Sequence, residues 1–157
     1  PVGHRGAVVG VAALLLPLGP FPLNVMPEIT TAGIIRHDGL FLVAKRKEGG
    51  SMSGRWEFPG GKADADETPR DALRREIREE FGAAARVGRH LVSTSFENHP
   101  KTYTLHVFEV FLESPDLTLH EHAEVRWLRF PDIGALDLAD SDRRVFELLS
   151  GQMTVPD

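Results

Sequence analysis

Residues 60–83 constrain this chain more than any other stretch, because they join a glycine turn, an acidic loop and the pattern of a capped helix. Thr68 can accept a hydrogen bond from the first turn, and Pro69 suits the first helical position. Gly82 can end the helix in the left-handed conformation. These signals predict a helix that begins after Thr68 and stops at Gly82.

The predicted helix has an apolar stripe with an acidic flank beside it. Three apolar residues recur every four positions and should pack on a core: Leu73, Ile77 and Phe81. At 100° per residue, Glu80, Glu76 and Glu79 lie about 20°, 60° and 120° from Leu73. The three carboxylates therefore share one side of the helix, next to buried surface.

Three carboxylates on one flank repel one another. At ~6 Å and an effective dielectric near 20, each pair costs roughly 2–3 kcal/mol. Arg75 can pair with Glu79 at i,i+4, but one guanidinium does not neutralise three acids. A hard divalent cation such as Mg²⁺ can, since it takes oxygen ligands from carboxylates and substrate phosphates. The alternative is a solvated acidic face.

The wider spacing resembles the Nudix hydrolase signature, a glycine followed by acids at fixed intervals and a closing glycine. Eight residues fall on that signature: Gly61, Glu67, Arg75, Glu76, Ile77, Glu79, Glu80 and Gly82. Ala83 departs from it, because the family prefers a bulkier aliphatic residue there, and we expect slightly looser packing after the helix. The preceding residues 56–62 narrow the resemblance to the MutT-like branch, over about residues 28–150.

The resemblance implies a fold and a metal site. The fold is an α/β/α sandwich with a mixed, mainly antiparallel sheet and the Nudix loop–helix–loop. The implied metal is Mg²⁺, with Mn²⁺ also possible, and its ligands are the Gly60 carbonyl, Glu76, Glu79, Glu80 and Glu121. Arg75 would hold Glu76 in place, Glu67 would organise the loop, and either Glu80 or Glu121 would activate water.

The resemblance also implies substrate contacts. Arg46 would reach a phosphate, Glu57 and Phe58 would touch the base, and Lys62 and Asp142 complete the substrate-binding set. Each has a structural alternative: Phe58 can be a core residue, Arg46 a basic strand end in water, and Asp142 or Ser141 the cap of the last helix. An aspartate at 142 leaves the base identity open, since it can accept from guanine or from cytosine.

Size and charge restrict the remaining possibilities. With 157 residues and 41% hydrophobic content, one globular domain is expected. A net charge of −5 argues against gripping long nucleic acid through a basic surface, although not against small nucleotides. The absence of cysteine excludes thiol catalysis and disulfides. We expect a cytoplasmic protein, a monomer or homodimer, with no membrane partner.

The first 25 residues differ from the rest. Residues 7–18 form an apolar run too short to span a bilayer comfortably. We interpret residues 1–25 as an N-terminal extension of uncertain role and residues 26–157 as the Nudix domain. A signal-peptide core, or an extra element packed on the domain, is the alternative.

The rest of the chain reads as strands closed by a helix. Asp38-Gly39 predicts a tight hairpin between two apolar runs. The expected strands are 29–37, 40–47, 56–58, 86–97, 102–113 and 125–130, and the last helix buries Val145, Leu148 and Leu149. His120 and His122 are expected in a loop, and not as metal ligands, since Mg²⁺ prefers oxygen.

The resemblance implies hydrolysis of a nucleoside 5′-triphosphate to the monophosphate and pyrophosphate. The first expectation is sanitation of damaged purine triphosphates such as 8-oxo-dGTP, in support of DNA repair. The second is a cytidine-type triphosphate, including modified dCTP. From another class, the chain could be a non-catalytic nucleotide sensor, but such domains commonly lose motif acids that this chain retains.

Overall fold

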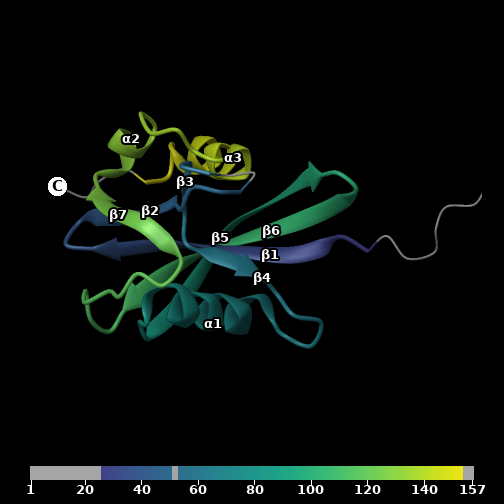
Figure 1. Cartoon of the computed structure of the whole chain (residues 1–157), viewed down its shortest axis with the longest axis horizontal. Helices are drawn as coiled ribbons and strands as arrows, with labels where there is room; N and C mark the ends of the chain where they lie inside the picture. Colours follow the sequence, from purple (N-terminus) through teal and green to yellow (C-terminus); the bar gives the residue numbers. More distant parts are fainter. Residues whose placement is uncertain (1–25, 51–52, 154–157) are drawn as a thin grey trace, which may run out of the picture.

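The computed structural model describes residues 26–50 and 53–153. The strands are β1 (Glu28–His37), β2 (Leu40–Arg46), β3 (Trp56–Glu57), β4 (Gly60–Lys62), β5 (Ala85–Asn98), β6 (Lys101–Leu112) and β7 (His122–Leu128). The helices are α1 (Pro69–Phe81), α2 (Phe130–Ile133) and α3 (Asp140–Leu149). Helix α1 lies on one side of the strands and α2 and α3 lie on the other (Figure 1). The predicted sandwich is confirmed.

Strand β1 is the centre of the sheet. It pairs in parallel with β6 and antiparallel with β2 and β4. The other pairings between named strands, β2 with β3 and β7 and β5 with β6, are antiparallel. The sheet is therefore mixed and mainly antiparallel, as predicted.

Both faces of β1 and β2 are buried, because a helical layer covers each side. Successive side chains point to opposite faces of a strand. Ile34 and Phe41 belong to the core under α2 and α3, whereas Ile35 and Leu42 belong to the core under α1. The hairpin between the strands turns through Asp38 and Gly39 at φ 50° and 75°, as its sequence predicts.

Helix α1 has the predicted caps. Thr68 Oγ1 accepts from the Asp71 backbone N–H at 3.2 Å, and Gly82 adopts φ 62° with its N–H donating to the Arg78 carbonyl. The predicted stripe is fully buried: Leu73, Ile77 and Phe81. Ala83 is also buried and joins the same core. The small residue is thus accommodated within the packing of α1.

Two local predictions and one of the alternatives, the side-chain cap of the last helix, are wrong. Residues 60–62 form strand β4 on β1 instead of a free turn. His122 opens β7 and is buried, whereas a loop position was expected; His120 does lie outside the strand. Helix α3 begins at Asp140 after Ala139 with no side-chain cap, so neither Ser141 nor Asp142 caps it. In each case the local structure depends on a contact with a residue that is distant in sequence: β1 for residues 60–62, Glu57 for His122 and Phe58 for Asp142.

The N-terminal prediction, residues 1–25, lies outside the described residues. Among residues 26–50 and 53–153, none of the helices combines the length and the hydrophobicity that a membrane span requires.

Candidate active site

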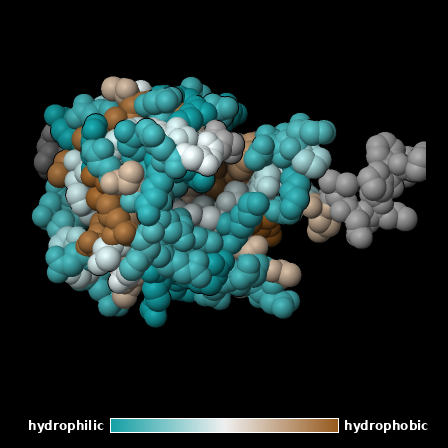
Figure 2. Space-filling view, in the orientation of Figure 1, coloured by the Kyte–Doolittle hydropathy of each residue, from teal (hydrophilic) through white to brown (hydrophobic). Residues whose placement is uncertain are grey.

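Two adjoining cavities share Arg46 and Glu57 as part of their walls. The first is lined by aromatic, apolar and polar residues, among them Phe58, Phe96 and Asp142. The second is lined by acidic, basic and imidazole groups, including Lys47, Glu80, Glu121 and His122. Figure 2 shows a largely hydrophilic surface that is hollowed between the β5–β6 hairpin and the body of the molecule. We call these the aromatic cavity and the acidic cavity.

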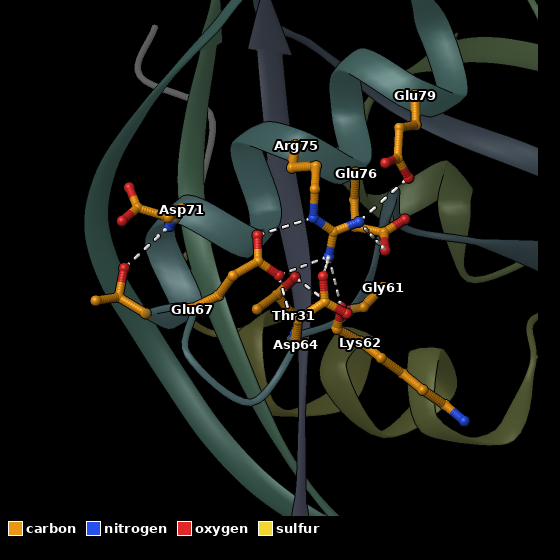
Figure 3. A network of polar contacts seen from close by, with 10 residues as sticks. Thr31, Gly61, Lys62, Asp64, Glu67, Asp71, Arg75, Glu76 and Glu79 are labelled. Carbon is orange, nitrogen blue, oxygen red and sulfur yellow. Dashed lines mark hydrogen bonds and ion pairs between the residues drawn. The ribbon is translucent and has the colours of Figure 1, made fainter.

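Arg75 organises the motif loop and the first part of α1. Its guanidinium donates to Glu67 through Nε and Nη2, both at 2.8 Å, and to the Lys62 carbonyl at 3.0 Å. The Nη1 group reaches Glu76 at 3.1 Å and Glu79 at 3.2 Å. Figure 3 shows the side chains of Glu67, Glu76 and Glu79 around the guanidinium. The predicted contact between Arg75 and Glu76 is present.

Glu67 ties the loop to this guanidinium. Its Oε1 also accepts from the Asp64 backbone N–H at 2.9 Å. The hydrogen bond from Arg75, followed by that from Asp64, lowers the pKa of Glu67 to about 2. Glu67 is therefore ionised at neutral pH, and it links the loop at Asp64 to Arg75 of helix α1.

Glu80 is the buried acid of the cluster. It is 4% exposed, and its Oε2 has no hydrogen-bond partner among the described residues. Burial, followed by the charges of Glu57, Glu76 and Glu121, raises the pKa of Glu80 to about 9. A buried carboxyl oxygen without a hydrogen-bond donor is costly unless a positive charge meets it. The unpartnered oxygen thus fits a cation at this point.

Glu76 lies directly over the glycine pair. A Cβ on Gly61 would meet the Glu76 carboxylate at 2.4–2.7 Å, so only glycine leaves room for that acid. Burial is also the main cause that raises the pKa of Glu76, with Arg75 acting in the opposite direction. Gly60 is packed more closely still, because its Cβ would lie 2.1 Å from the Thr31 carbonyl oxygen.

Glu79 is turned toward Arg75, and its side chain is 50% exposed. In this conformation the residues described here bring no three acidic or histidine side chains within reach of one ion. Glu80 and Glu121 do share the acidic cavity. The order of burial, Glu80 before Glu76 before Glu79, follows the angular order predicted along α1.

A chain of polar contacts runs from the buried His122 to the half-exposed Arg46, where the two cavities meet. His122 Nε2 lies 2.7 Å from Glu57 Oε1, and Glu57 Oε2 accepts a hydrogen bond from Arg46 Nε at 2.7 Å. Arg46 Nη2 lies at ion-pair distance from the same oxygen, 2.7 Å. No local sequence signal points to the contact of His122 with Glu57, because the two residues are 65 positions apart. The predicted residues Arg46 and Glu57 are brought together here.

Phe58 and Asp142 meet in the aromatic cavity. Phe58 is 3% exposed and stacks on Phe130, with centroids 6.5 Å apart, so it is both a core residue and a cavity wall. Asp142 Oδ1 accepts from the Phe58 backbone N–H at 2.8 Å. Burial, followed by the charge of Glu57, raises the pKa of Asp142 to about 7.

Lys62 is not brought into either cavity. Its Nζ lies 5.1 Å from the centroid of the Tyr103 ring and 3.8 Å from Glu28, and its side chain is 61% exposed. Of the predicted substrate-binding residues, Lys62 is therefore the one that the structure leaves outside the cavity walls.

Comparison with known proteins agrees with this architecture. The NUDIX domain model matches residues 27–149. A protein of Escherichia coli (strain K12) named CTP pyrophosphohydrolase is 37% identical over 116 residues, covering 74% of this chain and 86% of that protein. The 8-oxo-dGTP diphosphatase of Haemophilus influenzae is 51% identical over 55 residues, 34% of this chain and 40% of that protein.

A solved structure shows the same fold along nearly its whole length. The solution structure of the E. coli ORF135 protein aligns with a TM-score of 0.72 at 34% identity, covering 83% of this chain and 94% of that one. The chain belongs to the Nudix hydrolase family, whose members generally use divalent metals such as Mg²⁺.

Proposed function

We propose that this chain hydrolyses a nucleoside 5′-triphosphate to the nucleoside monophosphate and pyrophosphate. The observation that carries the proposal is the buried Glu80 carboxyl with an unpartnered oxygen in a cavity that also holds Glu121. Family membership and the intact motif acids favour an enzyme over a nucleotide sensor.

The ion in this proposal is Mg²⁺, with Mn²⁺ as a substitute. Glu76, Glu79, Glu80, Glu121 and the Gly60 carbonyl would hold it, after Glu79 turns away from Arg75. When bound, the ion supplies positive charge to the phosphates and makes water more acidic. Arg75 keeps Glu76 over Gly61, and so keeps one ligand in place without touching substrate.

Hydrolysis needs a base for the attacking water. Glu80 or Glu121 would accept the proton as the water oxygen bonds to phosphorus. The attacked phosphorus then loses its bond to the oxygen that bridges the α-phosphate and β-phosphate, and the group on the other side leaves with that oxygen and the electron pair of the broken bond. Both carboxyl groups line the same cavity, which supports either assignment.

Substrate binding is assigned to the aromatic cavity and to its junction with the acidic cavity, where Arg46 and Glu57 line both. Arg46 would meet the phosphate chain and Phe58 would pack against the base. Asp142 lines the same cavity and would read the base edge. Glu57 belongs to this set as the group that pairs with Arg46, and Lys62 would join only by turning away from Tyr103.

We assign the nucleobase of the substrate to an oxidised purine, as in 8-oxo-dGTP. The protein would then remove damaged nucleotides from the nucleotide pool. The relative named 8-oxo-dGTP diphosphatase supports this choice. The second candidate is a cytidine-type triphosphate, supported by the relative named CTP pyrophosphohydrolase and by an aspartate that can accept from the cytosine amine.

A panel of nucleotides in Mg²⁺, scored separately for pyrophosphate and for phosphate, tests the proposal. We expect pyrophosphate release, with the highest kcat/KM for 8-oxo-dGTP or for a cytidine-type triphosphate. Phosphate release as the first product, or turnover unaffected by EDTA, would overturn it.

A further inference from the structure

The His122 side chain is a buried polar group to which the proposed hydrolysis gives no task. The side chain is 3% exposed, and its ring lies parallel to Phe81 with centroids 5.2 Å apart and an interplanar angle of 4°. A phenylalanine would serve that packing equally well. The reason for an imidazole at this position therefore lies in its nitrogens.

The position of the ring hydrogen follows from the contacts of the two nitrogens. Nε2 lies 2.7 Å from Glu57 Oε1, whereas Nδ1 is buried and has no partner among the described residues. A hydrogen on Nδ1 alone would leave a buried donor unpaired and set the lone pair of Nε2 against a carboxylate. Nε2 therefore carries the hydrogen and donates it to Glu57.

Glu57, held by the hydrogen bond from His122, in turn holds Arg46. Its Oε2 accepts a hydrogen bond from the guanidinium Nε at 2.7 Å and forms an ion pair with Nη2 at 2.7 Å. The Glu57 side chain is 11% exposed, whereas that of Arg46 is 49% exposed. An arginine half in water samples many rotamers, and charge-assisted bonds to a fixed carboxylate select one of them.

Arg46 stands where the two cavities meet, because it and Glu57 line both. A nucleotide with its base beside Phe58 and its phosphates near Glu80 has to pass this guanidinium. The orientation of Arg46 thus bears directly on how the phosphate chain is bound.

We propose that His122 is a positioning residue, which acts through Glu57 to hold the Arg46 guanidinium at the junction of the two cavities, where it meets the phosphate chain. This role deepens the proposed triphosphate hydrolysis and rests on it. His122 itself does not contact substrate.

Two substitutions separate hydrogen bonding from packing. His122→Phe keeps a ring against Phe81 and removes the donor, whereas His122→Gln removes the ring and keeps an N–H within reach of Glu57. Positioning predicts that His122→Phe raises KM about tenfold with kcat changed less than about threefold, and that His122→Gln keeps KM within about threefold. A packing role predicts the reverse order and would overturn the proposal.

A double-mutant cycle tests whether the effect passes through Arg46. In an Arg46→Ala background, adding His122→Phe should change KM less than about twofold. A second tenfold rise would overturn the proposal. His120→Leu, in the exposed loop two residues earlier, is the control and should leave both constants unchanged. Where His122→Phe fails to fold, His122→Asn, whose amide is too short to reach Glu57, replaces it with the same expectations.

An NMR measurement gives an answer independent of turnover. The Arg46 Nε–H signal should exchange slowly with water in the unmodified protein and in His122→Gln, and about tenfold faster in His122→Phe. Equal exchange rates in the unmodified protein, His122→Gln and His122→Phe would refute the proposal that His122 orders Arg46 through Glu57. If the unmodified protein hydrolyses no triphosphate, the proposed function fails, while this comparison still decides whether His122 orders Arg46.

Discussion

Replacing Asp142 with asparagine should change the pH dependence of stability in a way that the structure specifies. Burial raises the pKa of Asp142 from 3.8 to about 7. The folded protein then keeps a proton up to about pH 7, while the unfolded chain releases it near pH 4. Since the folded state binds more protons in this window, the contribution of Asp142 to stability falls as pH rises from about 4 to about 7 and stays level above.

The size of the effect follows from the shift. Each pKa unit is worth about 1.4 kcal/mol, so the full penalty at pH 7 and above is at most about 4 kcal/mol. Asparagine has no proton to lose, and its Oδ1 can still accept from the Phe58 N–H. The Asp142→Asn variant should therefore gain free energy of unfolding relative to the unmodified protein as pH rises from 4 to 7.

Urea unfolding of both proteins at intervals between pH 4 and pH 8 measures this difference. Asp140→Asn is the control, because its side chain is 91% exposed in the first turn of the same helix, and its difference should stay within about 0.5 kcal/mol at every pH. A flat difference for Asp142→Asn would show that the carboxyl is not enclosed beneath Phe58, and the reasoning about the aromatic cavity would fail.

Three further substitutions test the motif loop. Gly60→Ala should prevent stable folding, because its Cβ would lie 2.1 Å from the Thr31 carbonyl in the pairing of β4 with β1; circular dichroism and urea unfolding check this. Gly61→Ala should stay folded by the same measurements but lower kcat at least about tenfold, since its Cβ meets only the carboxylate end of the Glu76 side chain and displaces it. Arg75→Lys should also lower kcat about tenfold or more at saturating Mg²⁺, because a single ammonium does not reproduce the forked contacts to the loop and to Glu76. Full activity in either of the last two variants would contradict the assigned positioning.

The helix and the hairpin could be predicted from sequence because their determinants are local. Thr68, Gly82 and the apolar stripe act within one helix, and the Asp38-Gly39 turn acts between adjacent strands. The spacing of the motif acids also fixed the order in which α1 buries them. These features do not depend on how distant parts of the chain meet.

The errors arise where a distant partner decides the local structure. Residues 60–62 resemble a turn, yet they pair with β1, about 30 positions away. His122 stands in a polar segment typical of a loop, but Glu57 and Phe81 make its burial possible. Aspartate is a common helix cap, but Asp142 instead accepts a hydrogen bond from the backbone N–H of Phe58, 84 positions away.

The most direct test of the central claim is the turnover of Glu80→Gln beside the unmodified protein, with Mg²⁺ and the preferred triphosphate. The unmodified protein should release the monophosphate and pyrophosphate. The variant should unfold cooperatively and lose about a hundredfold or more in kcat, because the buried acid proposed to hold the ion and to activate water is gone. Unchanged turnover in the folded variant would contradict the account.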